Sequence, residues 1–196
     1  MTTTSKRPSQ LTPADHVPGP QQGQWTYSHY AALSDDGQRY EIVDGVLYMA
    51  PSPTEFHQVI VYLIATHLNI HVQFTGLGLV LGAPFDLKLS VETVVQPDVL
   101  VFLNKAEYQE TSKLPDLVVE VASPSTAKQD RTLKYHAYEQ ASIKEYWIVN
   151  PFARNVEVLT LEAGKYYSVG IFSSEDRICS IVIPHFPVRA RQLFGR

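Results

Sequence analysis

Apolar residues along the chain follow helical spacing in two main segments. Between residues 54 and 73 they recur every three or four positions, which predicts one long helix. Its buried stripe is expected to comprise Phe56, Val59, Ile60, Leu63, Ile64 and Leu68. A second helix is expected to carry Leu133, Ala137 and Ala141 and to end near Ser142. A short helix is also expected over residues 26–35.

Strand patterns fill much of the remaining chain. The segment RYEIVDGVLYMA alternates on both sides of Asp44-Gly45, a dipeptide that favours a two-residue hairpin turn. A second hairpin is expected to turn at Ala163-Gly164, and KEYWIVN reads as a buried strand. Helices and strands do not alternate regularly. The order therefore predicts an α/β (α+β) sandwich with a central mixed β-sheet flanked by helices.

Length and composition indicate one folded domain. The chain has 196 residues, of which 44% are hydrophobic, and this suffices for one sizeable core over residues 25–196. Residues 1–24 are polar and rich in Pro and Gln, so we expect a disordered tail. No apolar run has the length of a membrane span or signal peptide, which favours a cytoplasmic protein without membrane contact. The single cysteine, Cys179, excludes an intrachain disulfide and is expected to be buried in a strand.

The charge balance limits the kinds of nucleic-acid protein that the chain can be. It has 16 basic and 20 acidic side chains, a net charge of −4. A protein that coats DNA through phosphate contacts is normally basic, so that class is disfavoured. A nuclease with a local cationic cleft remains possible, because bound metal ions add positive charge at the site.

Two carboxylates interrupt the most apolar strand patterns. Asp98 opens PDVLVFL, and Glu120 lies inside DLVVEVA. Burying an ionised carboxylate in such a strand costs several kcal/mol unless a cation or enough donors meet it. If the two strands are neighbours, both acids converge on a site for a hard cation such as Mg²⁺, with the carbonyl of Val121 as a third ligand. Lys134, or alternatively Lys128, would supply an ammonium suited to phosphodiester hydrolysis.

These residues also carry a resemblance to a known family. An Asp after Pro on one strand and a Glu on the next is similar to the PD-(D/E)xK nuclease superfamily, although Ala122 stands at the usual lysine position. The longer pattern resembles the Uma-type putative restriction endonucleases, a family abundant in cyanobacteria. Between Tyr40 and Tyr167 it comprises YEIVDG, the helix containing His57, QPD, LVVEVASPST, the lysine-bearing helix and EYWIVNP.

The resemblance implies a restriction-endonuclease-like fold and hydrolysis of DNA with Mg²⁺ or Mn²⁺. It assigns metal binding to Asp98, Glu120 and the Val121 carbonyl, with Glu41 as an extra ligand. It carries the displaced catalytic lysine over to Lys134 and implies a homodimer. Two further residues are expected to support the site: Gln96 through a hydrogen bond, and His57 through a phosphate contact or by polarising the site.

Plainer interpretations stay open. Asp98 could accept backbone hydrogen bonds in a loop, Lys134 could pair with Asp130 on a helix surface, and His57 could be an interior residue. For the whole chain, the first alternative is an inactive nuclease-like scaffold for binding or assembly, favoured by the displaced lysine and the acidic charge. The second is a metal-dependent phosphodiesterase that acts on RNA or nucleotides.

Overall fold

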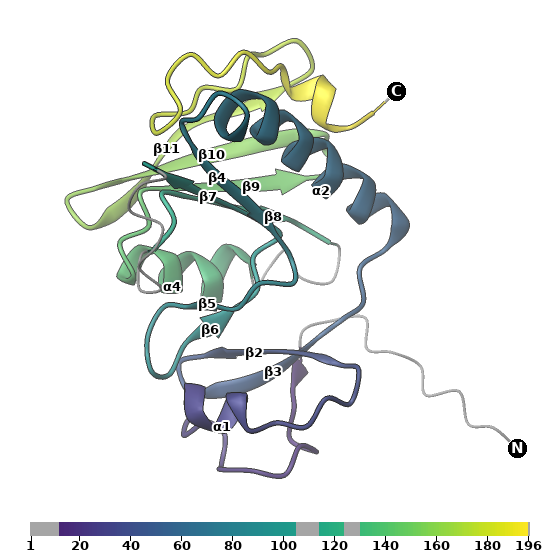
Figure 1. Cartoon of the computed structure of the whole chain (residues 1–196), viewed down its shortest axis with the longest axis vertical. Helices are drawn as coiled ribbons and strands as arrows, with labels where there is room; N and C mark the ends of the chain where they lie inside the picture. The colour runs from purple at the N-terminus through teal and green to yellow at the C-terminus, as the bar shows by residue number, and fades with distance from the viewer. Residues whose placement is uncertain (1–11, 105–113, 124–129, 196) are drawn as a thin grey trace, which may run out of the picture.

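The fold consists of two β-sheets stacked along the long axis of the molecule (Figure 1). The computed structural model describes residues 12–104, 114–123 and 130–195, without the side chains of residues 130 and 131. The smaller sheet has the order β1-β3-β2-β6-β5. Its strands are β1 Thr12–Pro13, β2 Arg39–Val43, β3 Val46–Ala50, β5 Leu87–Lys88 and β6 Val94–Val95.

The larger sheet has the order β11-β10-β9-β8-β7-β4. Its strands are β4 Gly78–Gly82, β7 Val99–Leu103, β8 Leu117–Val121, β9 Glu145–Asn150, β10 Asn155–Glu162 and β11 Lys165–Ser173. β8 and β9 are parallel, and the other neighbouring pairs are antiparallel. The expected mixed central sheet is therefore confirmed.

Helices cover both faces of the larger sheet (Figure 1). The helical segments are α1 Tyr27–Ala31, α2 Glu55–Leu68, η1 Asn69–Gln73, η3 Asp130–Lys134, α4 Tyr135–Gln140 and η4 Ala190–Leu193. α2 and the C-terminal segment pack on one face, and α4 packs on the face turned toward the smaller sheet. Among the described residues, no helix is both long enough and apolar enough to cross a membrane.

The long helix is confirmed, with a correction to its buried stripe. The side chain of Thr54 accepts a hydrogen bond from the backbone N–H of His57 and so caps α2. The π-helical segment η1 continues the helix to Gln73. Phe56 and Val59, expected in the core, are 44% and 45% exposed. The buried face instead comprises Ile60, Ile64, Leu68 and Val72, one residue every four positions.

Both expected hairpins are confirmed, and their turns have the geometry that two-residue loops require. Asp44 and Gly45 join β2 to β3 with φ of 50° and 73°. Ala163 and Gly164 join β10 to β11 with φ of 49° and 79°. Two consecutive left-handed residues match the right-handed twist of the strands that they connect.

The N-terminal boundary expected at residue 24 is wrong for residues 12–24. β1 pairs with β3, Ala14 is fully buried, and the side chain of Gln22 accepts a hydrogen bond from the backbone N–H of Leu47. Ala14 and Val17 pack with Trp25 in a small core of their own. This segment therefore gains buried area and backbone pairing that composition alone did not indicate.

The expected strand around Cys179 is also absent, and Cys179 is exposed. A buried carboxylate takes the place of a neighbouring strand. Glu145 accepts hydrogen bonds from the backbone N–H groups of Ile181 and Val182, and from Ser180 and Trp147. Because the backbone N–H groups of Ile181 and Val182 donate to this side chain, they do not pair with a neighbouring strand, and the segment around Cys179 forms no regular β-ladder.

We expect Glu145→Ala to destabilise the fold strongly. Glu145 has no exposed surface, and its removal leaves four donors without their acceptor. The loss should be about 3 kcal/mol or more, measured by urea denaturation. Glu162→Ala, at an exposed position in the same sheet, is the control and should change stability by less than about 0.5 kcal/mol. Equal losses in both variants would contradict this role.

We expect Ser142→Gly to stabilise the protein. Ser142 follows α4 with φ of 61°, a left-handed conformation in which a Cβ is unfavourable. Removing the Cβ should add about 0.5–1 kcal/mol and raise the melting temperature by a few degrees. Ser142→Ala keeps the Cβ and is the matched control; a similar gain from alanine would argue against this explanation.

Candidate active site

The two acids in the apolar strands lie opposite each other. β7 and β8 pair with Val99 opposite Val119, and continuing this register by one residue sets Asp98 opposite Glu120. Directly opposed residues of an antiparallel pair share a face, with Cβ atoms about 5 Å apart. Both residues are buried, with 8% and 4% of their surface exposed. The expectation that these strands are neighbours is confirmed.

One oxygen of Asp98 is fixed by the protein, and the other has no donor among the described residues. Oδ2 accepts a 2.8 Å hydrogen bond from the backbone N–H of Val121 and lies 3.3 Å from Nε2 of His57. Within the described parts of the chain, no group donates to Oδ1. The carboxylate is therefore held in orientation while one of its oxygens remains available to a ligand.

His57 lies in the first turn of α2, beside Asp98. Burial opposes protonation of the imidazole, but the hydrogen bond and negative charge of Asp98 outweigh it, together with the Val121 carbonyl. The net result is a pKa above the ordinary value for histidine. His57 thus contacts the carboxylate of Asp98, one of the groups expected to bind metal.

Lys134 lies between two buried carboxylates that come from different sheets. Its Nζ donates to Oε1 of Glu120 at 2.9 Å and to Oε1 of Glu41 at 3.0 Å. Glu120 belongs to β8 of the larger sheet, and Glu41 to β2 of the smaller one. Lys134 is 7% exposed and ends the π-helical segment η3, a conformation often found at functional sites.

Tyr138 also contacts Glu120, and it was not singled out from the sequence. Its hydroxyl donates a 2.6 Å hydrogen bond to Oε1 of Glu120. Burial, and then the charge of Glu120, hold the pKa of the phenol well above its ordinary value, so it remains a donor. The sequence did contain an indication of this contact, because Tyr138 follows Lys134 by four residues and the two therefore lie on one face of the helix.

Gln96 supports the site in an unexpected way. Its backbone N–H donates to Oε1 of Glu41 at 2.7 Å. Its side chain contacts Arg39 and Asp86. The alternatives that involve Lys128 and an Asp130–Lys134 pair fall outside the described residues and side chains.

The donor set suits a hard divalent cation. Within the described ranges, no three His, Cys, Asp or Glu side chains lie close enough to share a metal ion. The groups at the site are Oδ1 of Asp98, the carboxylate of Glu120, whose Oε1 accepts from Lys134 and Tyr138, and the carbonyl of Val121, all oxygen ligands. Mg²⁺ binds through one or two carboxylates and keeps several waters, so this small set fits Mg²⁺ or Mn²⁺.

A mixed sheet flanked by helices, with two buried acids on adjacent strands and a buried lysine beside them, agrees with the restriction-endonuclease-like fold expected from the sequence. The family model of Uma2, described as "Putative restriction endonuclease", matches residues 26–186. The chain therefore belongs to the Uma2 family. This membership supports a nuclease-like hydrolase that acts on phosphodiester bonds, in a family whose general chemistry uses divalent metals.

A solved structure has a similar fold. It is the crystal structure of a putative nuclease belonging to DUF820 from Anabaena variabilis ATCC 29413, with a TM-score of 0.69 and 18% sequence identity. The similarity covers 87% of this chain and 97% of that one. No curated protein sequence matches this chain.

We expect Lys134→Met to destabilise the protein, because it leaves Glu41 and Glu120 buried without their ammonium. Breaking a buried pair in this way should cost about 3 kcal/mol or more, measured by urea denaturation. Lys144→Met is the matched control: its ammonium is 69% exposed and pairs with Asp116, so the loss should stay below about 1 kcal/mol. A small effect at Lys134 would mean that its ion pairs contribute little.

Proposed function

We propose that the protein is an endonuclease that hydrolyses DNA phosphodiester bonds with Mg²⁺ or Mn²⁺. The observation that carries the proposal is the buried pair Asp98 and Glu120, opposed on adjacent strands, with the Lys134 ammonium at hydrogen-bond distance from Glu120. Family membership supports the hydrolase class. The metal, the DNA substrate and the residue roles are the proposed part.

Three groups would hold the metal: Oδ1 of Asp98, the carboxylate of Glu120 and the carbonyl of Val121. When bound, the ion would stabilise negative charge on the phosphate and lower the pKa of a bound water. The protein's part is to hold these ligands in place. The Val121 N–H and His57 fix Asp98, while Tyr138 fixes Glu120.

Lys134 would orient the attacking water and offset the negative charge that develops during the reaction. An ammonium already held in a buried site needs little rearrangement when that charge forms. Glu41 accepts a hydrogen bond from the ammonium opposite Glu120. We therefore assign Glu41 to the positioning of Lys134, in place of the direct metal contact expected from the resemblance.

The remaining roles concern substrate and assembly. His57, beside Asp98 and with a raised pKa, can present an imidazolium to a phosphate oxygen. A homodimer would let two such sites act on the two strands of a duplex. We include the dimer in the proposal because the resemblance to restriction endonucleases implies it.

One observation favours a second candidate, a scaffold without turnover. The Lys134 ammonium forms ion pairs with both Glu41 and Glu120 and so compensates charge on the two acids. Two buried acids can therefore be tolerated without metal. Such a protein would bind a partner or nucleic acid but would not hydrolyse it.

We expect Glu120→Gln to weaken Mn²⁺ binding by at least about tenfold in calorimetry, since even the loss of a residue that only orients a metal ligand can cost that much. Cleavage of plasmid DNA should be lost with it. Lys134→Met should retain Mn²⁺ binding while the cleavage rate falls by roughly a hundredfold or more. Glu162→Gln, an exposed carboxamide variant, is the control for both assays.

The outcomes separate the candidates. Equal Mn²⁺ affinities of the wild type and Glu120→Gln would refute the ligand assignment. Mn²⁺ binding without cleavage of DNA or RNA would favour the scaffold. Cleavage of RNA but not of DNA would keep the chemistry and change the substrate.

A further inference from the structure

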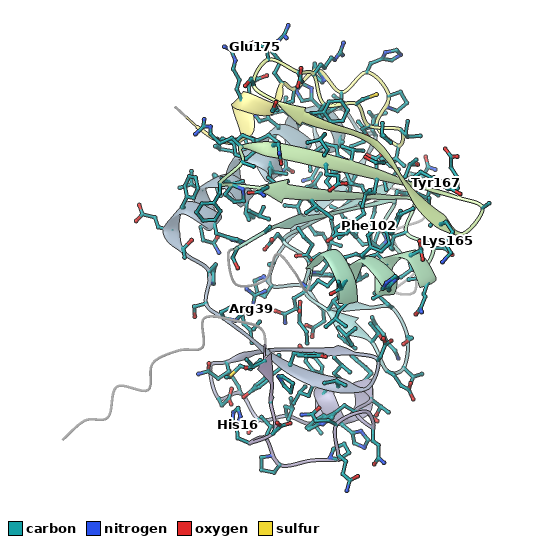
Figure 2. All side chains as sticks on the ribbon, turned by 180° about the vertical axis from the view of Figure 1, so that it is seen from behind. His16, Arg39, Phe102, Lys165, Tyr167 and Glu175 are labelled. Atoms are coloured by element: carbon teal, nitrogen blue, oxygen red, sulfur yellow. The ribbon has the colours of Figure 1, made fainter. Side chains whose placement is uncertain are left out.

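Arg39 lies at the start of β2, the middle strand of the smaller sheet, close to the candidate site. It is the first residue of β2, two positions before Glu41, so both side chains lie on the same face of the strand. Arg39 is half-buried, and Figure 2 places it between the two sheets. Its charge also acts on His57, since it lowers the pKa of that imidazole against the stronger effect of Asp98. The guanidinium is therefore within electrostatic range of the site.

A hydrogen-bond network fixes one side of this guanidinium. Nε of Arg39 donates to Oε1 of Gln96 at 3.0 Å. Nε2 of Gln96 donates to Oδ1 of Asp86 at 2.8 Å and to the hydroxyl of Tyr30 at 3.3 Å, while Tyr30 donates to the same oxygen of Asp86 at 2.8 Å. The amide of Gln96 is thus held with its oxygen toward Arg39.

The other side of the guanidinium has no protein partner in the described ranges. Neither Nη1 nor Nη2 of Arg39 makes a hydrogen bond or an ion pair with a described residue. An arginine with a purely structural role would be expected to pair with a carboxylate, but the acceptor here is a neutral amide that binds only Nε. Two parallel N–H donors in a fixed plane match the oxygens of a phosphate.

We propose that Arg39 binds a backbone phosphate of the nucleic acid beside Asp98 and Glu120, and that Gln96 is its positioning residue. The proposal deepens the nuclease assignment and rests on it. Glu41, Asp98 and Glu120 would otherwise repel a polyanion, and the chain as a whole carries a net charge of −4. A cation held beside the site by Gln96 offsets that repulsion where the nucleic-acid backbone must approach.

The test measures binding of a fluorescein-labelled DNA duplex by anisotropy over a range of salt concentrations, with Ca²⁺ as the divalent ion. Gel analysis after each titration verifies that the duplex is intact. Arg39→Ala should weaken binding about tenfold, and the slope of log K against log salt should become shallower by about 0.9, one phosphate contact. Arg39→Lys should keep the slope and lose part of the affinity, because its charge remains without the planar pair of donors.

Gln96→Leu separates positioning from charge. It removes the acceptor for Nε but leaves the guanidinium and the backbone N–H that serves Glu41. Affinity should fall while the salt slope stays that of the wild type. The control is Arg191→Ala, which removes an equal charge paired with Glu175. Glu175 lies at one end of the molecule, away from Arg39 between the sheets (Figure 2), so this variant should match the wild type.

Thermal melts establish that each variant is folded. The salt slope of Arg39→Ala is compared with those of the wild type and Arg191→Ala. If all three slopes are equal, the role of Arg39 is overturned and the nuclease proposal stays intact. The wild type could also bind the duplex without cleaving it in the presence of Mn²⁺. If the salt slope of Arg39→Ala is then still shallower than that of the wild type, the role of Arg39 is supported and the nuclease proposal is refuted. A wild type that does not bind the duplex would overturn the Arg39 proposal, whatever the cleavage assay gives.

Discussion

The ammonium of Lys134 is the contact on which the arrangement of this protein depends. It joins Glu41 of the smaller sheet to Glu120 of the larger one, and it is delivered by the π-helical segment before α4. Three buried charges are unfavourable separately, because each has lost its hydration. Together they compensate one another, so the two sheets and the helix must meet at one point. The candidate active site lies where this constraint brings Glu41 near Glu120, with Asp98 opposite Glu120 on the neighbouring strand.

Two buried carboxylates of the larger sheet show how structural and chemical roles differ. Both oxygens of Glu145 are occupied, since four donors converge on them and attach the C-terminal segment to the sheet. Asp98 is equally well oriented, yet only its Oδ2 accepts hydrogen bonds from described residues. A carboxylate whose donors are all supplied by the fold stabilises it. A carboxylate held in place with one oxygen left over is prepared for a ligand.

Much of the fold could be predicted because its signals are local. Alternation, turn dipeptides and helical spacing gave the hairpins and α2, and strand alternation set Asp98 and Glu120 on one face. Partners distant in the chain could not be read in this way. Lys134 and Glu41 are 93 residues apart, and no periodicity indicates their contact. Likewise, Glu145 removes the backbone donors of Ile181 and Val182 from a strand pattern that looked regular.

Strand β1 has an importance out of proportion to its two residues. It covers the outer edge of β3, where unpaired N–H and C=O groups would otherwise be open to another chain. The match to the Uma2 family begins only at residue 26, beyond this strand. A shortened protein that starts there would keep every candidate catalytic residue. It would also present a bare sheet edge and lose Ala14 from its small core, which favours self-association through that edge.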